Sequence, residues 1–395
     1  MIICQETQCT GCFACINECK LDCISMEENH YGELHPKIDD SKCIECGACQ
    51  KVCPNNAEVS YRYPIICYAA WNTNHTKRAK SASGGIGNAL ADFTINKKNG
   101  VFVGTQYNKD FIPVHTMAKK GDDISCYQGS KYIKSIVGNS TFRQIQSLLE
   151  KGTDVTYIST PCQIAGLLSF LKKKYDNLIT VDLMCHGVSP TRYFKDELTR
   201  IMRNKKISHL TDVRFRDNEN HNFRMTLWDN EKLLFNKSGR CEYYFAAFLY
   251  GISLRESCYS CKYAKPERIS DITIGDFIGL GKDVSFNHPK ENVSAVLLNT
   301  EKGKLFYEEM SKAYPTIKNE QRLYEERLAY PYSLREPTPR PKCREKFRQQ
   351  VRIKGFSKAI RKTIGFKVLK SRFWEFLRQY AITRKLLKVI KIDKD

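Results

Sequence analysis

The chain has 395 residues, 18 of them cysteines, and a formal net charge of +21. That length is sufficient for two or three domains, each with a hydrophobic core. So long a chain is not a small secreted scaffold that depends on disulfides. In a cytoplasmic chain, closely spaced cysteines usually bind metal. The charge is concentrated at one end, because residues 341–395 hold 18 Lys and Arg against four Asp and Glu. Since no recognisable nucleic-acid-binding module accompanies this basic tail, we expect no nucleic-acid partner.

We expect the protein to be cytoplasmic. Met1-Ile2-Ile3-Cys4 leads directly into the first cysteine motif, without the apolar segment of a signal peptide. The longest apolar run, Tyr243 to Ile252, is about half of the roughly 20 residues that a membrane-spanning helix needs.

Two cysteine motifs in the first 53 residues have the spacing of bacterial ferredoxins. They are Cys9-x2-Cys12-x2-Cys15-x3-Cys19 and Cys43-x2-Cys46-x2-Cys49-x3-Cys53-Pro54. Three closely spaced thiolates bind three corners of a [4Fe–4S] cubane, and in two-cluster ferredoxins the fourth cysteine of each run binds the other cluster. The motifs therefore predict two clusters within residues 1–62. One would be bound by Cys9, Cys12, Cys15 and Cys53, and the other by Cys43, Cys46, Cys49 and Cys19.

The two motifs form an internal repeat with an offset of 34 residues, which predicts a pseudo-two-fold axis. The first copy departs from the pattern, with Lys20 where the second has Pro54 and Cys23 where the second has Ala57. We interpret Cys23 as a buried packing residue rather than a ligand. Structural zinc and disulfides are the alternatives for the eight ligands.

Residues 65–150 are predicted to begin with a strand at 65–71, followed by a polar loop and a helix at 86–95. Ser81-Ala82-Ser83-Gly84-Gly85 lies at the start of that helix. Small residues there let backbone N–H groups bind an anion, and the helix dipole favours negative charge. A plain N-capping loop is the alternative.

Residues 151–205 show the alternation of strand, helix, strand and helix that is typical of parallel pairing with right-handed crossovers. The predicted strands are 154–159 and 178–184, and the predicted helices are 164–174 and one that starts at Pro190. Cys162 and Cys185 follow the two strands directly. Because ligands gather where parallel strands end, we expect both cysteines at the same edge of the sheet.

Residues 210–300 are predicted to form strands at 211–216, 223–228, 272–275 and 293–299, with a helix at 243–250. Cys258-x2-Cys261 lies between that helix and the third strand. Together with Cys162 and Cys185 it provides the four thiols that a third cluster requires. Cys258 and Cys261 could instead be a redox dithiol or half of a zinc site, and Cys162 and Cys185 buried packing residues.

A helix at 301–312 followed by irregular structure is predicted to complete this part, which ends near residue 335. The tail, 342–395, is helical in composition, with Phe373, Leu377, Tyr380, Leu387 and Ile390 at approximately helical spacing among basic residues. It could pack on the domain, or lie on an anionic membrane with Phe373 and Trp374 inserted. Contact with nucleic acid or an acidic protein is the third interpretation.

Several short motifs, in this order, resemble the beta subunit of coenzyme F420 hydrogenase/dehydrogenase. They are Ser81 to Gly85, Gly129-Ser130-Lys131-Tyr132, Thr160-Pro161-Cys162-Gln163, Cys185-His186-Gly187, Cys258-x2-Cys261-x-Tyr263-Ala264 and Asp271 to Phe277. The resemblance covers roughly residues 65–335, behind the kind of ferredoxin module that is often fused to such proteins. The fold that we expect is an α+β ferredoxin-like domain at 1–62, then an α/β domain with a mixed sheet, and finally the basic helical tail. Within the α/β domain we expect a flavin-binding part at 65–150 and a part with the third cluster at 151–335.

The resemblance implies FAD, although FMN is not excluded, and a cluster close to the flavin held by Cys162, Cys185, Cys258 and Cys261. The cofactor-binding residues that it implies are Ser81, Ser83, Gly84, Gly85 and Lys131. It does not imply the deazaflavin itself, because members of the family act on other acceptors. Fusions with basic tails also resemble proteins encoded among surface-polysaccharide genes.

Clusters carry single electrons and flavins exchange one or two, so this set of cofactors predicts an oxidoreductase that reduces or oxidises an organic or deazaflavin-like acceptor. An electron-transfer subunit that serves a catalytic partner is the alternative, and an iron–sulfur scaffold or sensor without flavin is a third hypothesis. A ferredoxin or a catalytic subunit would be the redox partner. Arg214, Arg216 and His186 are candidate substrate or flavin contacts. In the alternative interpretation, the two arginines are solvated strand residues and His186 is a histidine with a structural role in a turn.

Overall fold

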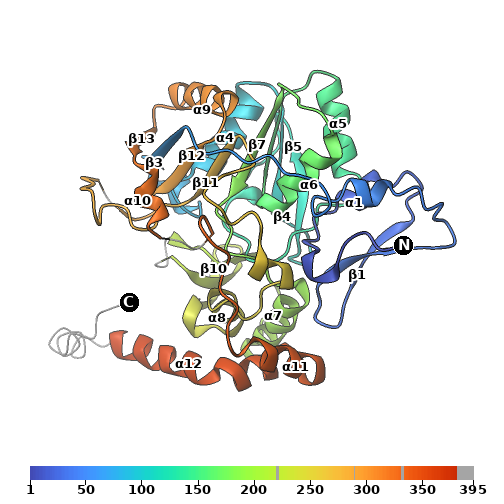
Figure 1. The fold of residues 1–395 in the computed structure, drawn as a ribbon. Coiled ribbons are helices and arrows are strands. Elements are labelled where there is room, and N and C mark those ends of the chain that lie inside the picture. The colour runs from blue at the N-terminus through green and yellow to red at the C-terminus, as the bar shows by residue number, and fades with distance from the viewer. Residues whose placement is uncertain (219–221, 289, 331–332, 380–395) are drawn as a thin grey trace. The chain divides into compact units, whose positions relative to one another are not determined.

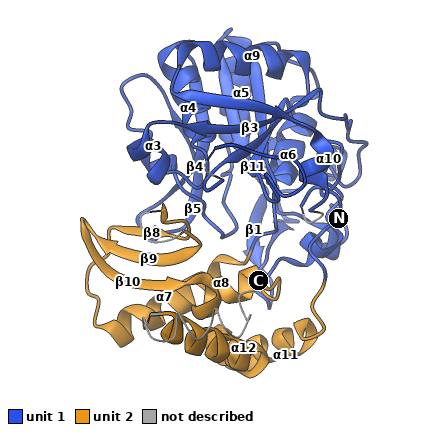
Figure 2. Ribbon diagram, turned by 90° about the vertical axis from the view of Figure 1, so that its left-hand side faces the viewer, with its two compact units in different colours: residues 1–188, 254–339 blue, residues 189–253, 340–395 orange. Residues whose placement is uncertain are grey.

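The computed structural model describes residues 1–218, 222–288, 290–330 and 333–379 (Figure 1). These residues form two compact units (Figure 2). Unit 1 comprises Met1–Val188 and Leu254–Pro339, and unit 2 comprises Ser189–Ser253 and the chain from Arg340 onwards. Among the described residues, no helix has both the length and the apolar character needed to cross a membrane.

The N-terminal part of unit 1 shows the internal repeat in its backbone. Helix α1 (Ala14–Glu18) and helix α2 (Ala48–Lys51) each begin after a left-handed residue, Phe13 with φ 71° and Gly47 with φ 72°. These positions are related by the same offset as the cysteine motifs. A short helix, η1 (Glu6–Gln8), precedes them, and a hairpin of β1 (Ile24–Glu28) and β2 (Leu34–Ile38) joins the two copies.

A mixed sheet forms the centre of unit 1. In the described part of the chain its strands lie in the order β13 (Ile317–Arg322), β3 (Ile66–Asn72), β12 (Ser294–Leu298), β11 (Ile272–Asp276), β7 (Leu178–Leu183), β6 (Val155–Ser159), β4 (Val101–Tyr107) and β5 (Pro113–Ala118). Strands β4, β6, β7 and β11 are mutually parallel, as the sequence predicted for β6 and β7. Strand β3 has the same direction, because it is antiparallel to β12, which is antiparallel to β11.

Helices cover both faces of this sheet (Figure 1). On one face, α4 (Ile86–Asn96) and α9 (Glu301–Ala313) share a core with the buried side chains of β7, β11 and β12. On the other face, α5 (Thr141–Glu150) and α6 (Pro161–Leu171) pack on β6. Strands β3 and β12 contribute alternate side chains to two cores, which explains the apolar runs in their sequences.

The cysteine-rich module packs against α5 and α6 within unit 1. Asn17 of α1 accepts a hydrogen bond from the backbone N–H of Phe142 at 3.0 Å and donates one to the carbonyl oxygen of Gly138 at 2.9 Å. Ser169 of α6 donates to the carbonyl oxygen of Val52 at 2.8 Å. Phe13 and Ile16 belong to the same hydrophobic core as the side chains of α6. The module is thus held on one face of the α/β part.

Unit 2 combines a small antiparallel sheet with helices. The sheet contains β8 (Asp212–Arg214), β9 (Arg224–Asp229) and β10 (Lys232–Ser238), and the helices are α7 (Thr191–Lys205), η4 (Gly239–Cys241), α8 (Tyr243–Leu249), α11 (Arg344–Lys354) and α12 (Phe356–Gln379). Aromatic side chains form its core, as in the stacked rings of Tyr193 and Phe356, with centroids 5.2 Å apart. The helical tail is confirmed as far as residue 379, and Tyr380, Leu387 and Ile390 lie outside the described residues.

The structure corrects one expectation about these elements. Residues 313–335 were expected to be irregular, yet they contain β13 and α10 (Tyr324–Leu328). Strand β13 lies at the sheet edge and buries only Ile317, so its sequence lacks the apolar signal of a buried strand. The strands predicted within 210–300 are divided between the units, because β8 and β9 belong to unit 2 and β11 and β12 to unit 1. The remaining short helices are α3 (His75–Ala79), η2 (Ser125–Tyr127) and η5 (Glu256–Ser260).

Candidate iron–sulfur and cofactor site

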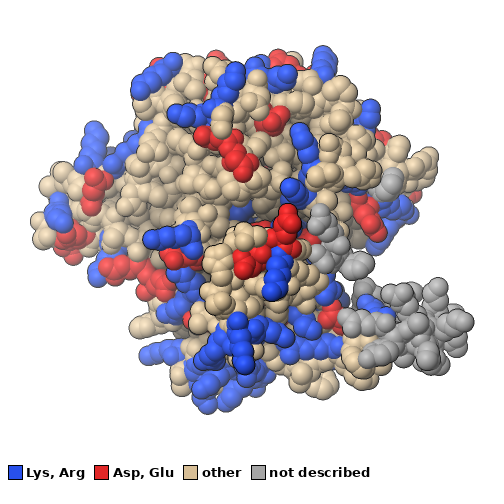
Figure 3. Space-filling model, turned by 180° about the vertical axis from the view of Figure 1, so that it is seen from behind, with Lys and Arg blue, Asp and Glu red and all other residues tan. Residues whose placement is uncertain are grey.

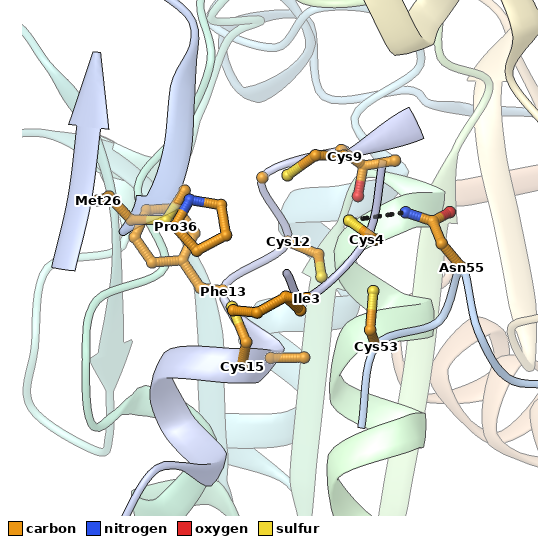
Figure 4. Close-up of a pocket in the computed structure, with 13 residues that line it drawn as sticks. Ile3, Cys4, Cys9, Cys12, Phe13, Cys15, Met26, Pro36, Cys53 and Asn55 are labelled. Carbon is orange, nitrogen blue, oxygen red and sulfur yellow. Dashed lines mark hydrogen bonds between the residues drawn. The ribbon is translucent and has the colours of Figure 1, made fainter. Parts of the chain in front are cut away.

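Five cysteines surround a cavity in the N-terminal module (Figure 4). They are Cys4, Cys9, Cys12, Cys15 and Cys53. The cavity has an empty volume of about 340 Å³, part of which is open solvent. The four predicted ligands are buried, each with at most 9% of its surface exposed, and Cys53 is brought to them from the second motif. We call these five residues the first thiol set.

Burial opposes the ionisation of two thiols of this set. Burial, together with the neighbouring thiols of Cys53, Cys9 and Cys162, raises the pKa of the Cys12 thiol to about 12. The pKa of Cys15 is raised well above its usual value for the same reasons. Ligand thiols are deprotonated outright when they bind a cation. Bound iron would supply the positive charge that such buried thiolates need.

The second thiol set comprises Cys19, Cys43, Cys46 and Cys49, with Cys23 beside them. The Cys19 and Cys23 sulfur atoms are 3.3 Å apart, and Cys23 also interacts with Cys43. Cys46 is exposed and Cys43 is half-buried, whereas Cys49 is buried. Cys23 is buried, as the sequence predicted, but it packs directly on a predicted ligand. This set reaches the protein surface, whereas the first set lies between the module and α6.

A third thiol set forms from three separate parts of the chain. Cys162 lies at the start of α6, Cys185 directly follows β7, and Cys258 and Cys261 lie in and after η5. The pKa of Cys185 is raised well above its usual value, first by burial and then by the thiols of Cys258, Cys162 and Cys261. All four thiols therefore lie close together.

Within the described residues, no three His, Cys, Asp or Glu side chains are arranged as the ligands of one metal ion. In a cubane each thiolate binds a different iron, so the four sulfur atoms need not converge on a single point.

Polar contacts hold the segment of Cys258 and Cys261 against the ferredoxin module and the sheet. Arg255 donates from Nε to the carbonyl oxygen of Cys9 at 2.8 Å, and Lys262 donates from Nζ to the carbonyl oxygen of Pro54. On the sheet side, Arg268 and Asp182 form an ion pair at 2.9 Å, with at most 1% of either side chain exposed. Removing one partner of such a buried pair typically costs 3–5 kcal/mol, so the segment is firmly positioned.

Helix α6 connects the first and third thiol sets. Cys162 is its second residue, and one turn later Gly166 lies against Cys12, so close that a Cβ on Gly166 would be 3.0 Å from the Cys12 Cβ. The Tyr263 hydroxyl is buried without a hydrogen-bond partner, near Cys162, Cys12 and Cys261. Cys12 of the first set therefore lies near Cys162 of the third.

The start of α4 lies at the same edge of the sheet as the third set. Gly85 precedes α4 with φ 86°, and the carbonyl oxygen of Gly84 accepts from Asn72 N–H, at the end of β3, at 2.8 Å. A Cβ on Gly84 would be 2.2 Å from the carbonyl oxygen of Ala70. The Ser83 hydroxyl is buried and has no partner, whereas Ser81 donates to the carbonyl oxygen of Lys77 at 2.8 Å. Unpaired N–H groups and a free hydroxyl at this helix start fit an anionic group such as a phosphate.

Lys131 lies in the loop between β5 and α5. Its ammonium group donates to the carbonyl oxygen of Gln128 at 3.0 Å and lies 5.3 Å from the centre of the Tyr107 ring. Tyr107 is the last residue of β4, so Lys131 lies near the same sheet edge.

The three candidate substrate contacts fall in different units. His186 follows Cys185 in unit 1, where its carbonyl oxygen accepts from Thr338 at 2.6 Å. Arg214 and Arg216 belong to unit 2, and they are engaged there by Asp212 and Asn222 respectively. Arg214 also lies over the Trp228 ring, and Arg216 is buried. The alternative interpretation as a solvated strand residue therefore does not fit Arg216, whereas Arg214 lies in β8 with 34% of its side chain exposed.

Sequence reasoning missed Cys4. It lines the first cavity beside Cys9 and Cys53, yet it belongs to neither motif. The internal repeat provides no signal either, because the corresponding position in the second copy is Ile38.

The paired ferredoxin motifs, their buried thiols and their contact with an α/β sheet define an iron–sulfur electron-transfer protein. Comparison with known families agrees. Residues 8–57 match the model of a 4Fe-4S dicluster domain, and a second model of that description matches residues 35–96. Residues 152–322 match the C terminus of the coenzyme F420 hydrogenase/dehydrogenase beta subunit. The chain therefore combines a 4Fe-4S dicluster domain with a C-terminal domain of the F420 hydrogenase/dehydrogenase beta-subunit family.

Similarity to individual proteins is local. Over 44 residues the chain is 46% identical to "Ferredoxin 7Fe" from Hydrogenibacillus schlegelii and 43% identical to a ferredoxin from Streptomyces griseus. Those residues are 11% of this chain, and they span 50% and 37% of the two relatives. A chain of the F420-reducing [NiFe] hydrogenase complex from Methanosarcina barkeri aligns at 15% identity with a TM-score of 0.43. That alignment covers 66% of this chain and 82% of the other.

Proposed function

We propose that the protein is an FAD-dependent iron–sulfur oxidoreductase that passes electrons through three [4Fe–4S] clusters to a flavin, where an organic acceptor is reduced. In this proposal the first and second thiol sets bind the two ferredoxin-type clusters. Cys162, Cys185, Cys258 and Cys261 bind the third. Clusters transfer one electron at a time, and a flavin exchanges one or two electrons or a hydride.

The contact between Gly166 and Cys12 is the observation that carries this proposal. It joins the first set to the helix that carries Cys162, so that the ligands of two clusters would lie on either side of one helical turn. The second set, with Cys46 exposed, offers a place for an external carrier such as ferredoxin to deliver electrons. The order from surface to interior is then second set, first set and third set.

The position of α4 supports a flavin at the end of this path. Its first turn and Cys185 both lie where parallel strands of the sheet end, which is the edge where such folds bind ligands. The unpartnered Ser83 hydroxyl, the close approach of Gly84 and the N–H groups after Gly85 would hold the phosphates. Ser81 and Lys131 would support this site from either side. His186, next to Cys185, is the candidate contact for the acceptor.

Purification without oxygen tests the proposal. We expect about 12 irons and one FAD per chain, and reduction of the flavin when reduced ferredoxin is added. Iron near 8 with no flavin would instead support the scaffold or sensor hypothesis, and zinc in place of iron would refute the proposal. If the protein reduces only artificial dyes, it is an electron-transfer subunit of a catalytic partner.

A role in surface-polysaccharide metabolism stays a prediction that rests on the resemblance of such fusions.

We also propose that unit 2 contacts an anionic membrane through α12. The inner face of this helix, with Ala359, Ile360, Ile364 and Val368, is fully buried in the unit. The opposite face exposes Phe366, Leu369 and Phe373 by 81%, 56% and 58%. These three residues recur at helical spacing, and we call them the outer stripe.

Basic residues surround the outer stripe. Lys and Arg side chains gather at the bottom of Figure 3, the end of the picture where Figure 1 labels α11 and α12. The exposed ones include Lys354, Lys358, Lys362, Lys367 and Lys370. The Lys362 pKa is lowered because Lys354 lies beside it, which shows how closely like charges are placed. Anionic headgroups would relieve this repulsion, and each Lys or Arg near such a surface is worth about 1 kcal/mol.

Replacing Phe366 and Phe373 together with serine tests this contact. Each aromatic ring that leaves the lipid should cost about 1.5–3 kcal/mol, so we expect binding to phosphatidylserine vesicles to weaken at least 100-fold. Vesicle co-sedimentation measures the effect. The matched control is Leu305→Ser on α9 in unit 1. Leu305 is 59% exposed, and its replacement should leave vesicle binding unchanged. Equal binding by the double variant and the wild type would contradict the proposal.

A further inference from the structure

The first thiol set contains one thiol more than a cubane can use. A cubane has four irons and binds one thiolate at each, whereas Cys4, Cys9, Cys12, Cys15 and Cys53 all line the same cavity. Cys4 is half-buried, while the other four are buried. In Figure 4 the Cys4 sulfur faces the space that the sulfur atoms of Cys12 and Cys53 also face.

Cys4 is in direct contact with two of the predicted ligands. The Cys4 thiol lies within hydrogen-bonding reach of the Cys53 and Cys9 sulfur atoms. The amide group of Asn55 is directed at the Cys4 sulfur, with Nδ2 at 4.0 Å. A thiol that only filled space would not need polar contacts with two ligands.

The backbone between Cys4 and Cys9 is short. Helix η1 fills it, and the N–H of Cys9 donates to the carbonyl oxygens of Gln5 and Glu6. Cys4 and Cys9 therefore approach the cavity from the two ends of one small loop. A modest adjustment of that loop would bring the Cys4 sulfur to the iron that Cys9 would bind, whereas Cys15 is fixed in the first turn of α1.

We propose that Cys4 is a reserve ligand of the first cluster, whose sulfur binds the iron of Cys9 when Cys9 is lost or chemically blocked. The inference rests on the proposed cluster in this cavity. The exchange transfers no electrons. The Cys4 thiol gives its proton to solvent as its sulfur binds iron, and a Cys9 thiolate that is displaced takes up a proton. The cluster would thus survive damage to one ligand.

Cys9→Ala in the full chain, purified without oxygen, tests the inference. We expect the variant to keep the iron and sulfide of the wild type, with a changed electron paramagnetic resonance signal for one cluster. The double variant Cys4→Ala/Cys9→Ala should lose about four irons. The control Cys126→Ala/Cys9→Ala removes an exposed cysteine outside all three sets and should behave like Cys9→Ala. A folded Cys9→Ala chain that has already lost about four irons would overturn the inference.

Alkylation supplies a second readout in case Cys9→Ala does not fold. In the iron-loaded wild type Cys4 should react with iodoacetamide without loss of iron, and mass spectrometry identifies the labelled peptide. Cys126 is the internal reference. Labelling of Cys9 instead of Cys4 would show that Cys4 is a resident ligand and would overturn the inference. A wild type without iron would refute the proposed function itself, and that result is distinct from both of these.

Discussion

Replacing Cys258 with alanine is expected to remove about four irons from each chain and to stop electrons from reaching the flavin. Cys258 contributes to the third thiol set together with Cys162, Cys185 and Cys261, and three thiols cannot bind all four irons of a cubane. The ferredoxin-type clusters should remain, because none of their predicted ligands is altered. Iron and sulfide analysis measures the loss, and the bleaching of the flavin by reduced ferredoxin measures electron passage.

Cys343→Ala is the matched control for this experiment. Cys343 is partly buried, as Cys258 is, but it belongs to unit 2 and to none of the thiol sets. We expect its iron content and flavin reduction to equal those of the wild type. An unchanged iron content in Cys258→Ala would show that the four thiols bind no cluster, and the path from the first set would then have no intermediate before the flavin.

Replacing Gly84 with alanine should destabilise unit 1 and also release the flavin. The added Cβ would be 2.2 Å from the carbonyl oxygen of Ala70 and 3.0 Å from the backbone nitrogen of Ser294. These are backbone atoms of two neighbouring strands and cannot rotate away. Overpacking of this kind costs about 1–3 kcal/mol, and we expect the upper end of that range in the free energy of unfolding. Denaturant unfolding of the protein without flavin measures this cost.

Ser83→Ala separates flavin binding from stability. The Ser83 hydroxyl is buried and has no partner in the protein, so removing it should leave the free energy of unfolding within about 1 kcal/mol of the wild type. A lost hydrogen bond to a phosphate should weaken FAD binding about tenfold. Ser371→Ala on the surface of α12 is the control, with neither effect expected. Unchanged FAD affinity in Ser83→Ala would argue against phosphate binding at this helix start.

Part of the site was predictable because many of its candidate ligands lie close together in the sequence. Within each ferredoxin motif, two residues separate each of the first three cysteines from the next, so a local loop is enough to present all three to one cluster. Strand and helix also alternate through β6, α6 and β7, and parallel strands end at the same edge. From this, Cys162 and Cys185 could be placed near each other without knowledge of the rest of the sheet.

Other features depend on the order of the strands and on packing between distant segments. The insertion of β11 beside β7, and the ion pair of Arg268 with Asp182, determine that Cys258 and Cys261 reach Cys162 and Cys185. The close contact of Gly166 with Cys12 requires the module to pack on α6. No local pattern encodes such contacts, because residues far apart in the sequence become neighbours only when the whole core is formed.

The amino-acid sequence by itself determined which groups can bind iron, because ligand type and close spacing are properties of a few neighbouring residues. The tertiary structure alone decided which thiols share a cavity, and it placed Cys4 in the first one. It also decided which face of α12 is exposed, since that helix has apolar residues on two sides and only packing selects the buried one. Burial and proximity are collective properties of the folded chain, so only the tertiary structure could show which cysteines lie together.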